Sequence, residues 1–241
     1  MVDDTKSPDQ VVEIEYSIST PDGHAQRYSI KLDNHSARLL NQPPAHPPAW
    51  TRLEVCQCAN CPLDAATHSH CPLAVQVAQV VDDWATFFSF QNVDYSVTTG
   101  ERRFSGTTEV KKILGSLLGL IMATSDCPRM LFLRPLARFH LPLASPEETA
   151  FRALSAYLLE RYFVAPDKVS TATFDGFIKR YNEIQTVNEG LAARMQEASQ
   201  EDAVIAAVLG LDLLAHRVPF FARETVETLR PLFAFPPGDI T

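Results

Sequence analysis

Residues 55–73 read V-C-Q-C-A-N-C-P-L-D-A-A-T-H-S-H-C-P-L, and this stretch separates a strand-rich beginning from a helix-rich remainder. It contains most of the cysteines of the chain and two of its histidines: Cys56, Cys58, Cys61, Cys71, His68 and His70. Thiolate and imidazole are the usual ligands of zinc, and two cysteines separated by two residues can turn both sulfurs onto one ion. The stretch therefore predicts a metal site at this junction.

Zinc is the metal that the pattern favours. Cys58 and Cys61 form the Cys-x2-Cys pair, and Pro62 beside them is a turn former that bends the chain around an ion. The residues that could complete a tetrahedron with this pair are Cys71, His68, His70 and Cys56. If this zinc is structural, its binding free energy contributes to folding, on the order of 10 kcal/mol.

Other interpretations of the cysteines stay open. An iron–sulfur cluster is the main alternative, because four cysteines also hold clusters and cluster motifs place a proline after a cysteine. The spacing differs from the common ferredoxin runs, and the nearby imidazoles suit zinc better. A thiol-based redox or metal sensor and inert buried thiols are further alternatives. Disulfides are not expected, because the chain begins M-V-D-D-T-K-S-P-D-Q without a secretory leader, which indicates a reducing, cytoplasmic environment.

Composition limits the classes of function. The 241 residues are 46% hydrophobic, enough for one large core, and the formal net charge of -8 with a pI near 5.3 is unfavourable for unspecific binding to nucleic acid or to anionic membranes. The longest apolar run, Ile113–Ala123, is shorter than the ~20 residues of a membrane-spanning helix. We therefore expect a cytoplasmic soluble protein, with its oligomeric state open.

The remainder of the chain predicts an α+β fold. Alternating apolar residues at Val12–Ser19 and Gln26–Leu32, joined by a turn, indicate an N-terminal β-hairpin, and a proline-rich connector follows it. Trp50 and Leu53 are typical of a third strand. The units that we expect are residues 1–54 (hairpin and connector), 55–73 (metal loop) and 74–241 (a helical body that includes a short second hairpin at 92–107).

Helices are predicted from three- and four-residue spacing of apolar residues. Ser145-Pro146-Glu147-Glu148 has the pattern of a capping box with proline at the first helical position. The expected helices begin at Pro72 and near Thr108, and then cover residues 146–163, 174–197, 203–216 and 221–235.

A second group of residues follows the most apolar helix. Cys127, Arg134, Arg138 and His140 suggest a pocket for a small anion, or a thiol nucleophile with an imidazole base. The alternative is structural: the arginines would pair with carboxylates or helix-end carbonyls, and the cysteine and histidine would be ordinary core or surface residues.

Motifs of the common enzyme classes are missing from the sequence. It has no phosphate-binding loop, dinucleotide-binding glycines, zinc-protease helix motif or serine elbow, and this lowers the expectation of catalysis.

The cysteine stretch and the helices after it, mainly from Trp50 to Ala74, resemble an uncharacterised bacterial family of small cysteine-loop proteins with no assigned activity. That resemblance implies no catalytic residue. We expect a metal-binding protein with structural zinc that acts as a protein-interaction or regulatory module, with a protein partner. An enzyme or small-anion binder at the Cys127 pocket, and a thiol-based sensor, are the alternatives.

Overall fold

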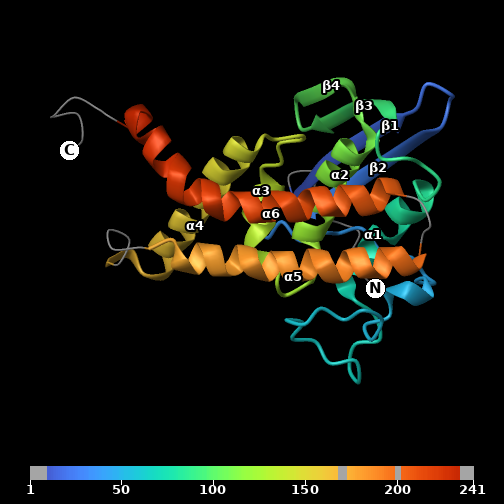
Figure 1. Cartoon of the computed structure of the whole chain (residues 1–241), viewed down its shortest axis with the longest axis horizontal. Helices are drawn as coiled ribbons and strands as arrows, with labels where there is room; N and C mark the ends of the chain where they lie inside the picture. Colours follow the sequence, from blue (N-terminus) through green and yellow to red (C-terminus); the bar gives the residue numbers. More distant parts are fainter. Residues whose placement is uncertain (1–9, 168–172, 199–201, 234–241) are drawn as a thin grey trace.

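The structure is a computed structural model that describes residues 10–167, 173–198 and 202–233 (Figure 1). Strands β1 (Val11–Ser19) and β2 (Ala25–Asp33) form the predicted N-terminal hairpin. Strands β3 (Asn92–Thr99) and β4 (Arg102–Glu109) form the second hairpin, which extends slightly beyond its predicted end. Because β1 also pairs antiparallel with β3, the two hairpins join into one four-stranded sheet of order β2-β1-β3-β4.

The helices and short 3-10 turns account for most of the remaining chain. The longer helices are α1 (Pro72–Asp83), α2 (Val110–Thr124), α4 (Pro146–Val164), α5 (Asp175–Ala198) and α6 (Asp202–Leu229). The shorter pieces are the 3-10 turns Ala49–Thr51, Leu131–Leu133 and Arg230–Phe233, and helix α3 (Arg134–Arg138). The fold class is α+β, as the sequence predicts.

One face of the sheet packs against the helices. Ile14, Tyr16 and Ile18 alternate along β1 and are buried, as expected for side chains that share one face of a strand. The Tyr16 hydroxyl lies 2.8 Å from the Ser116 hydroxyl of α2. Tyr28 of β2 donates to a carboxylate oxygen of Asp83 at 2.8 Å, at the end of α1. These hydrogen bonds hold the sheet to α1 and α2.

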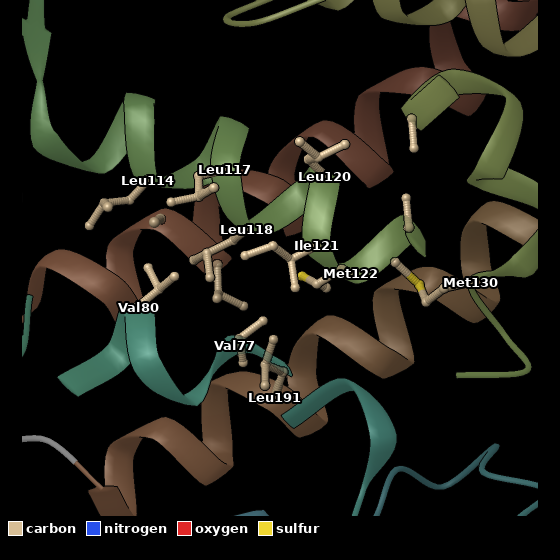
Figure 2. Close-up of a cluster of buried hydrophobic side chains, with 14 of the residues drawn as sticks. Val77, Val80, Leu114, Leu117, Leu118, Leu120, Ile121, Met122, Met130 and Leu191 are labelled. Atoms are coloured by element: carbon tan, nitrogen blue, oxygen red, sulfur yellow. The ribbon is translucent and has the colours of Figure 1, made fainter. Parts of the chain in front are cut away.

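Helix α2 is the centre of the hydrophobic core. Its apolar residues occupy most of the helix circumference and are almost fully buried, which is typical of a helix surrounded by other elements. Figure 2 shows Leu118 and Ile121 of α2 in the space between α1 and α5. Val77 comes from α1 and Leu191 from α5, and both are buried.

Helices α5 and α6 lie side by side along the long axis of the molecule (Figure 1). The sequence predicts two helices, 203–216 and 221–235, where the structure has the single helix α6 with Pro219 inside it. Proline removes one intrahelical hydrogen bond and bends a helix without always ending it. Figure 1 shows α6 bending towards its C-terminal end.

Helix α6 is long and apolar. Its segment Asp202–Phe220 has the length and composition of a membrane span, and 33% of its most apolar window is buried in the fold. The helix contacts α2, α4 and α5. Leu209 and Leu213 are among its exposed apolar residues, with exposed fractions of 54% and 56%.

Candidate metal centre

The cysteine loop is closed at its base by backbone hydrogen bonds. The Cys71 amide donates to the Thr51 carbonyl at 2.8 Å, and the Leu53 amide donates to the Ser69 carbonyl at 3.0 Å. Arg52 and His70 form an isolated antiparallel bridge beside them. The predicted third strand at Trp50–Leu53 is therefore wrong: this segment begins with a 3-10 turn, and its backbone pairs with the other end of its own loop rather than with the sheet.

Arg194 of α5 anchors the base of the loop to the helical body. This arginine is 1% exposed, and its guanidinium donates to the carbonyl oxygens of Arg52 at 2.5 Å, Leu53 at 2.9 Å and Trp50 at 3.2 Å. A buried cation needs such acceptors to replace the hydration it has lost. The loop is thus held at a defined position on α5.

A second clamp holds the tip of the loop. The side-chain amide of Asn60 donates through Nδ2 to the backbone carbonyl of Glu183 in α5 at 2.9 Å. Arg129, which follows α2, donates through Nε to the Asn60 carbonyl at 2.8 Å and lies 3.3 Å from the Glu183 carboxylate. The loop, α5 and the segment after α2 therefore meet at Asn60.

Four cysteines border one small cavity at this meeting point. The cavity has a volume of about 20 Å3 and is lined by side chains that include Cys58, Cys61, Cys71, Cys127, Arg129 and Arg194. A cavity of this size holds a single water-sized group. The thiols come from three parts of the chain: the loop, the N-cap of α1 and the segment after α2.

The local backbone explains the position of each loop cysteine. The Cys61 amide donates to the Cys58 carbonyl at 2.9 Å, which makes the tight turn expected of a Cys-x2-Cys pair. Cys71 is the N-cap of α1 with Pro72 at the first helical position, where the helix dipole favours negative charge. Cys58 packs on Gly190 of α5, where an added Cβ would come within 2.6 Å of the Cys58 sulfur. Only glycine permits this approach.

Burial controls the ionisation of two of these thiols. It raises the pKa of Cys58 to about 11 and that of Cys127 to about 12, and the neighbouring thiols act in the same direction. Arg194 opposes the rise at Cys58. Because the thiolate is the reactive form of cysteine, these two side chains are poor nucleophiles as free thiols.

Three of the six predicted metal ligands border this cavity, and the other three do not. His68 is exposed, with Nδ1 2.9 Å from the Thr67 hydroxyl, and His70 has Nδ1 2.9 Å from the Ser69 hydroxyl. Cys56 has a positive φ of 42° and is partly buried outside the cavity lining. Among the residues that the structure describes, no three histidine, cysteine or acidic side chains are grouped closely enough to hold one metal ion.

Cys127 borders the cavity although the sequence predicts it in a different site, the anion pocket. It lies far along the chain from residues 55–73, and only the fold brings it to the loop. One signal points to it: Cys127-Pro128 repeats the dipeptides Cys61-Pro62 and Cys71-Pro72.

The other residues of the predicted anion pocket have different partners. Arg134 lies 3.3 Å from Asp126, and Arg138 donates to the Asn34 side chain at 2.5 Å. His140 Nε2 is 2.5 Å from the Tyr16 hydroxyl and lines a separate, larger cavity. Neither cavity is lined by Arg134 or Arg138.

Comparison with known proteins agrees with an uncharacterised family. The family model described as "Domain of unknown function (DUF6901)" matches residues 14–234, from β1 to beyond the last 3-10 turn. No curated protein and no solved structure matches the chain. The match covers the sheet, the cysteine loop and all the long helices, so the chain belongs to the DUF6901 family of domains of unknown function.

Proposed function

We propose that this chain is a metal-binding protein in which Cys58, Cys61, Cys71 and Cys127 hold a single metal ion, zinc. The observation that carries the proposal is that four thiols from three parts of the chain line one cavity. Thiols have no packing reason to converge in this way, because a free cysteine packs like any small hydrophobic residue. Binding of a metal would explain why the four thiols converge.

The size of the cavity favours a zinc ion over an iron–sulfur cluster. All four candidate ligands are thiols, and neither histidine of the loop lines the cavity. The volume of about 20 Å3 admits a single ion, whereas a cluster consists of several iron and sulfide atoms. A zinc–thiolate site with bonds of about 2.3 Å brings its sulfurs to about 3.8 Å from one another. The described side chains are not grouped that closely, so binding would draw the thiols together.

Two further features fit a metal centre. Prolines follow Cys61, Cys71 and Cys127, and turn formers beside the ligands bend the chain around an ion. Arg129 and Arg194 also line the cavity, and their positive charges would offset the negative charge of a thiolate-ligated centre. An iron–sulfur cluster with the same four thiols is the alternative.

The centre would act as a structural tie. It would join the cysteine loop, the start of α1 and the segment after α2. The loop is already held to α5 by Arg194 and Asn60, and the segment after α2 by the ion pair of Arg129 with Glu183. Binding of this kind contributes to folding free energy, on the order of 10 kcal/mol for structural zinc sites. A cytoplasmic location and a protein partner that recognises the tied surface are part of the proposal.

An enzyme with Cys127 as nucleophile and His140 as base is less well supported. The two side chains line different cavities, and a base must lie within hydrogen-bonding reach of its nucleophile. The high pKa of Cys127 also disfavours nucleophilic and redox-sensor roles.

The direct test is analysis of iron, acid-labile sulfide and zinc in protein purified without oxygen, together with its visible absorption spectrum. A colourless protein with one bound zinc ion is expected. Iron with matching sulfide and a brown colour would transfer the proposal to the iron–sulfur alternative. A folded protein without either metal would refute metal binding.

Matched serine variants test the ligand set. Cys127→Ser should lose the metal, whereas Cys56→Ser should keep it, because only Cys127 of these two lines the cavity. His68→Ala should also leave the metal content unchanged. Loss of metal in Cys56→Ser with retention in Cys127→Ser would show that the site is confined to the loop, as the sequence alone suggests.

A further inference from the structure

A second, much larger cavity runs along α2 and α6. We call it the α2–α6 cavity; its volume is about 770 Å3, and its walls come from α2, α6, α5 and the segment between α3 and α4. Cavities of this size are typical of sites for small organic ligands. The walls are mainly apolar, and they include Leu120, Leu133, Leu136, Ile184, Leu211 and Leu214.

Two glycines of the cavity wall differ in what surrounds them. Gly119 of α2 faces Leu211 of α6, and an added Cβ there would lie 3.3 Å from the leucine side chain. At Gly210 of α6 an added Cβ would meet nothing within 4 Å, so this glycine borders open space. Leu209 and Leu213, the exposed leucines of α6, also line the cavity. They form an apolar rim at its mouth.

The charged residues of the wall are all cations, although the chain as a whole carries a net charge of -8. Lys111 and Lys112 lie near Glu109, at 3.4 and 3.2 Å. Arg152 of α4 has no ion pair among the described residues. Glu148 acts on the Arg152 guanidinium from beyond ion-pair distance. A cation without a direct carboxylate partner in an apolar wall attracts an anionic group.

Arg152 retains donors for a ligand. Its Nη2 group donates to the carbonyl oxygens of Leu136 at 2.7 Å and Phe139 at 2.6 Å, which fixes the guanidinium at the end of α3. Its Nε and Nη1 groups have no partner in the described part of the chain. Glu148, four residues earlier, accepts from the Ser145 amide at 2.8 Å in the cap of α4. The Arg152 guanidinium is therefore fixed in place, and some of its N–H donors remain without an acceptor.

Asn188 of α5 is a second polar feature of the same wall. It is 1% exposed, and neither its amide nitrogen nor its amide oxygen has a hydrogen-bond partner among the described residues. A buried polar group without partners is costly, and such groups are rare in folded proteins unless a ligand or water satisfies them. Asn188 is thus independent evidence that the cavity is built for an occupant.

We infer that the α2–α6 cavity binds a single-chain amphiphile with one anionic head, of the fatty-acid class, with its carboxylate at Arg152 and its chain along α2 and α6. The apolar walls accommodate the chain, and the free guanidinium donors accommodate the carboxylate. The exposed leucines of α6 form the entrance. We expect a single acid molecule in the cavity and not docking onto a bilayer surface. The reason is that Arg152, which has no ion pair, lies in the cavity wall and not on an open face.

The test is titration of the full chain, as purified with its metal, with dodecanoate below its micelle concentration, followed by calorimetry. One saturable site is expected, with affinity roughly tenfold or more above that for dodecanol or dodecyltrimethylammonium, because the head must accept hydrogen bonds from a cation. Absence of saturable dodecanoate binding would overturn the inference. Binding only to anionic vesicles, or self-association without dodecanoate binding, would also overturn it, in favour of a membrane or a second copy.

Variants locate the site. Arg152→Gln should weaken dodecanoate binding roughly tenfold and leave dodecanol binding unchanged. Arg27→Gln makes the same change in net charge on the exposed face of β2 and should have no effect. If Arg152→Gln fails to fold, Gly210→Leu keeps the test decisive. Its added side chain enters open space at the mouth and should weaken binding of both dodecanoate and dodecanol, and unchanged binding would refute the site.

Discussion

At the scale of single residues, two polar groups beside the α2–α6 cavity have measurable effects on stability. The Asn188 amide has no hydrogen-bond partner among the described residues, whereas His140 lines the cavity with its Nε2 2.5 Å from the Tyr16 hydroxyl. Buried polar groups without partners are rare in folded proteins. Substitutions at these two positions therefore measure how each group affects stability.

Asn188→Leu should stabilise the protein without added ligand. Leucine has the same number and branching of side-chain heavy atoms and removes a buried amide whose hydrogen bonds are unmet, so we expect a gain of about 1–2 kcal/mol in the free energy of unfolding. Urea denaturation measures it. Asn182→Leu, on the exposed side of the same helix, is the control and should change little. A marked loss of stability in Asn188→Leu would show that the amide has a partner in solution.

His140 should make stability depend on pH. Burial, assisted by the charge of Arg152, lowers its pKa to about 3, and the Tyr16 hydroxyl is 2.5 Å from its Nε2. Below a pH of about 6.5 the unfolded chain binds a proton that the folded chain excludes. The free energy of unfolding should thus fall as the pH drops from about 6.5 towards 3, by at most about 1.4 kcal/mol per pH unit.

His140→Gln should remove this share of the pH dependence. Denaturation at pH 7, 6 and 5 is expected to give a shallower slope for His140→Gln than for the native chain, whereas the exposed His35→Gln should retain the native slope. Equal slopes in all three proteins would mean that the folded protein takes up the proton at His140.

At the scale of secondary-structure elements, helix α4 follows its sequence signal closely. The Ser145 hydroxyl accepts from the Glu148 amide at 3.2 Å, and the Glu148 carboxylate accepts from the Ser145 amide at 2.8 Å, so the predicted capping box is confirmed. The box works because it satisfies two backbone donors that the first turn of a helix leaves free.

Ser145→Ala should cost about 1 kcal/mol of unfolding free energy, because the Glu148 amide loses its acceptor. Thermal or urea denaturation measures it. Ser155→Ala is the control: Ser155 is an exposed residue within α4, where alanine favours the helix. A loss as large in Ser155→Ala would mean that the effect does not come from the cap.

At the scale of the whole molecule, the cysteine cavity is where distant segments meet. Under the proposed function, removal of the metal should increase hydrogen exchange in residues 55–73, in the first turn of α1 and at Cys127, with little change in β1 and β2. Mass spectrometry of metal-loaded and metal-depleted protein measures it. Uniform protection in both states would show that no metal ties these segments together.

The local structure of this protein can be predicted from its residues. The two hairpins, the capping box of α4 and the buried character of α2 follow from alternation, capping and apolar periodicity, which involve residues within a few positions of each other. The Cys-x2-Cys turn follows for the same reason. Each depends only on near neighbours, so a pattern in the chain reveals it.

Which distant residues meet depends on how the elements pack. Pairing of β1 with β3 merged the hairpins, and Cys127 joined the loop cysteines while the loop histidines stayed outside the cavity. Helix α6 continued through Pro219 because its contacts with α2, α4 and α5 hold it in place. These outcomes depend on packing between segments far apart in the chain, and no local spacing encodes that packing.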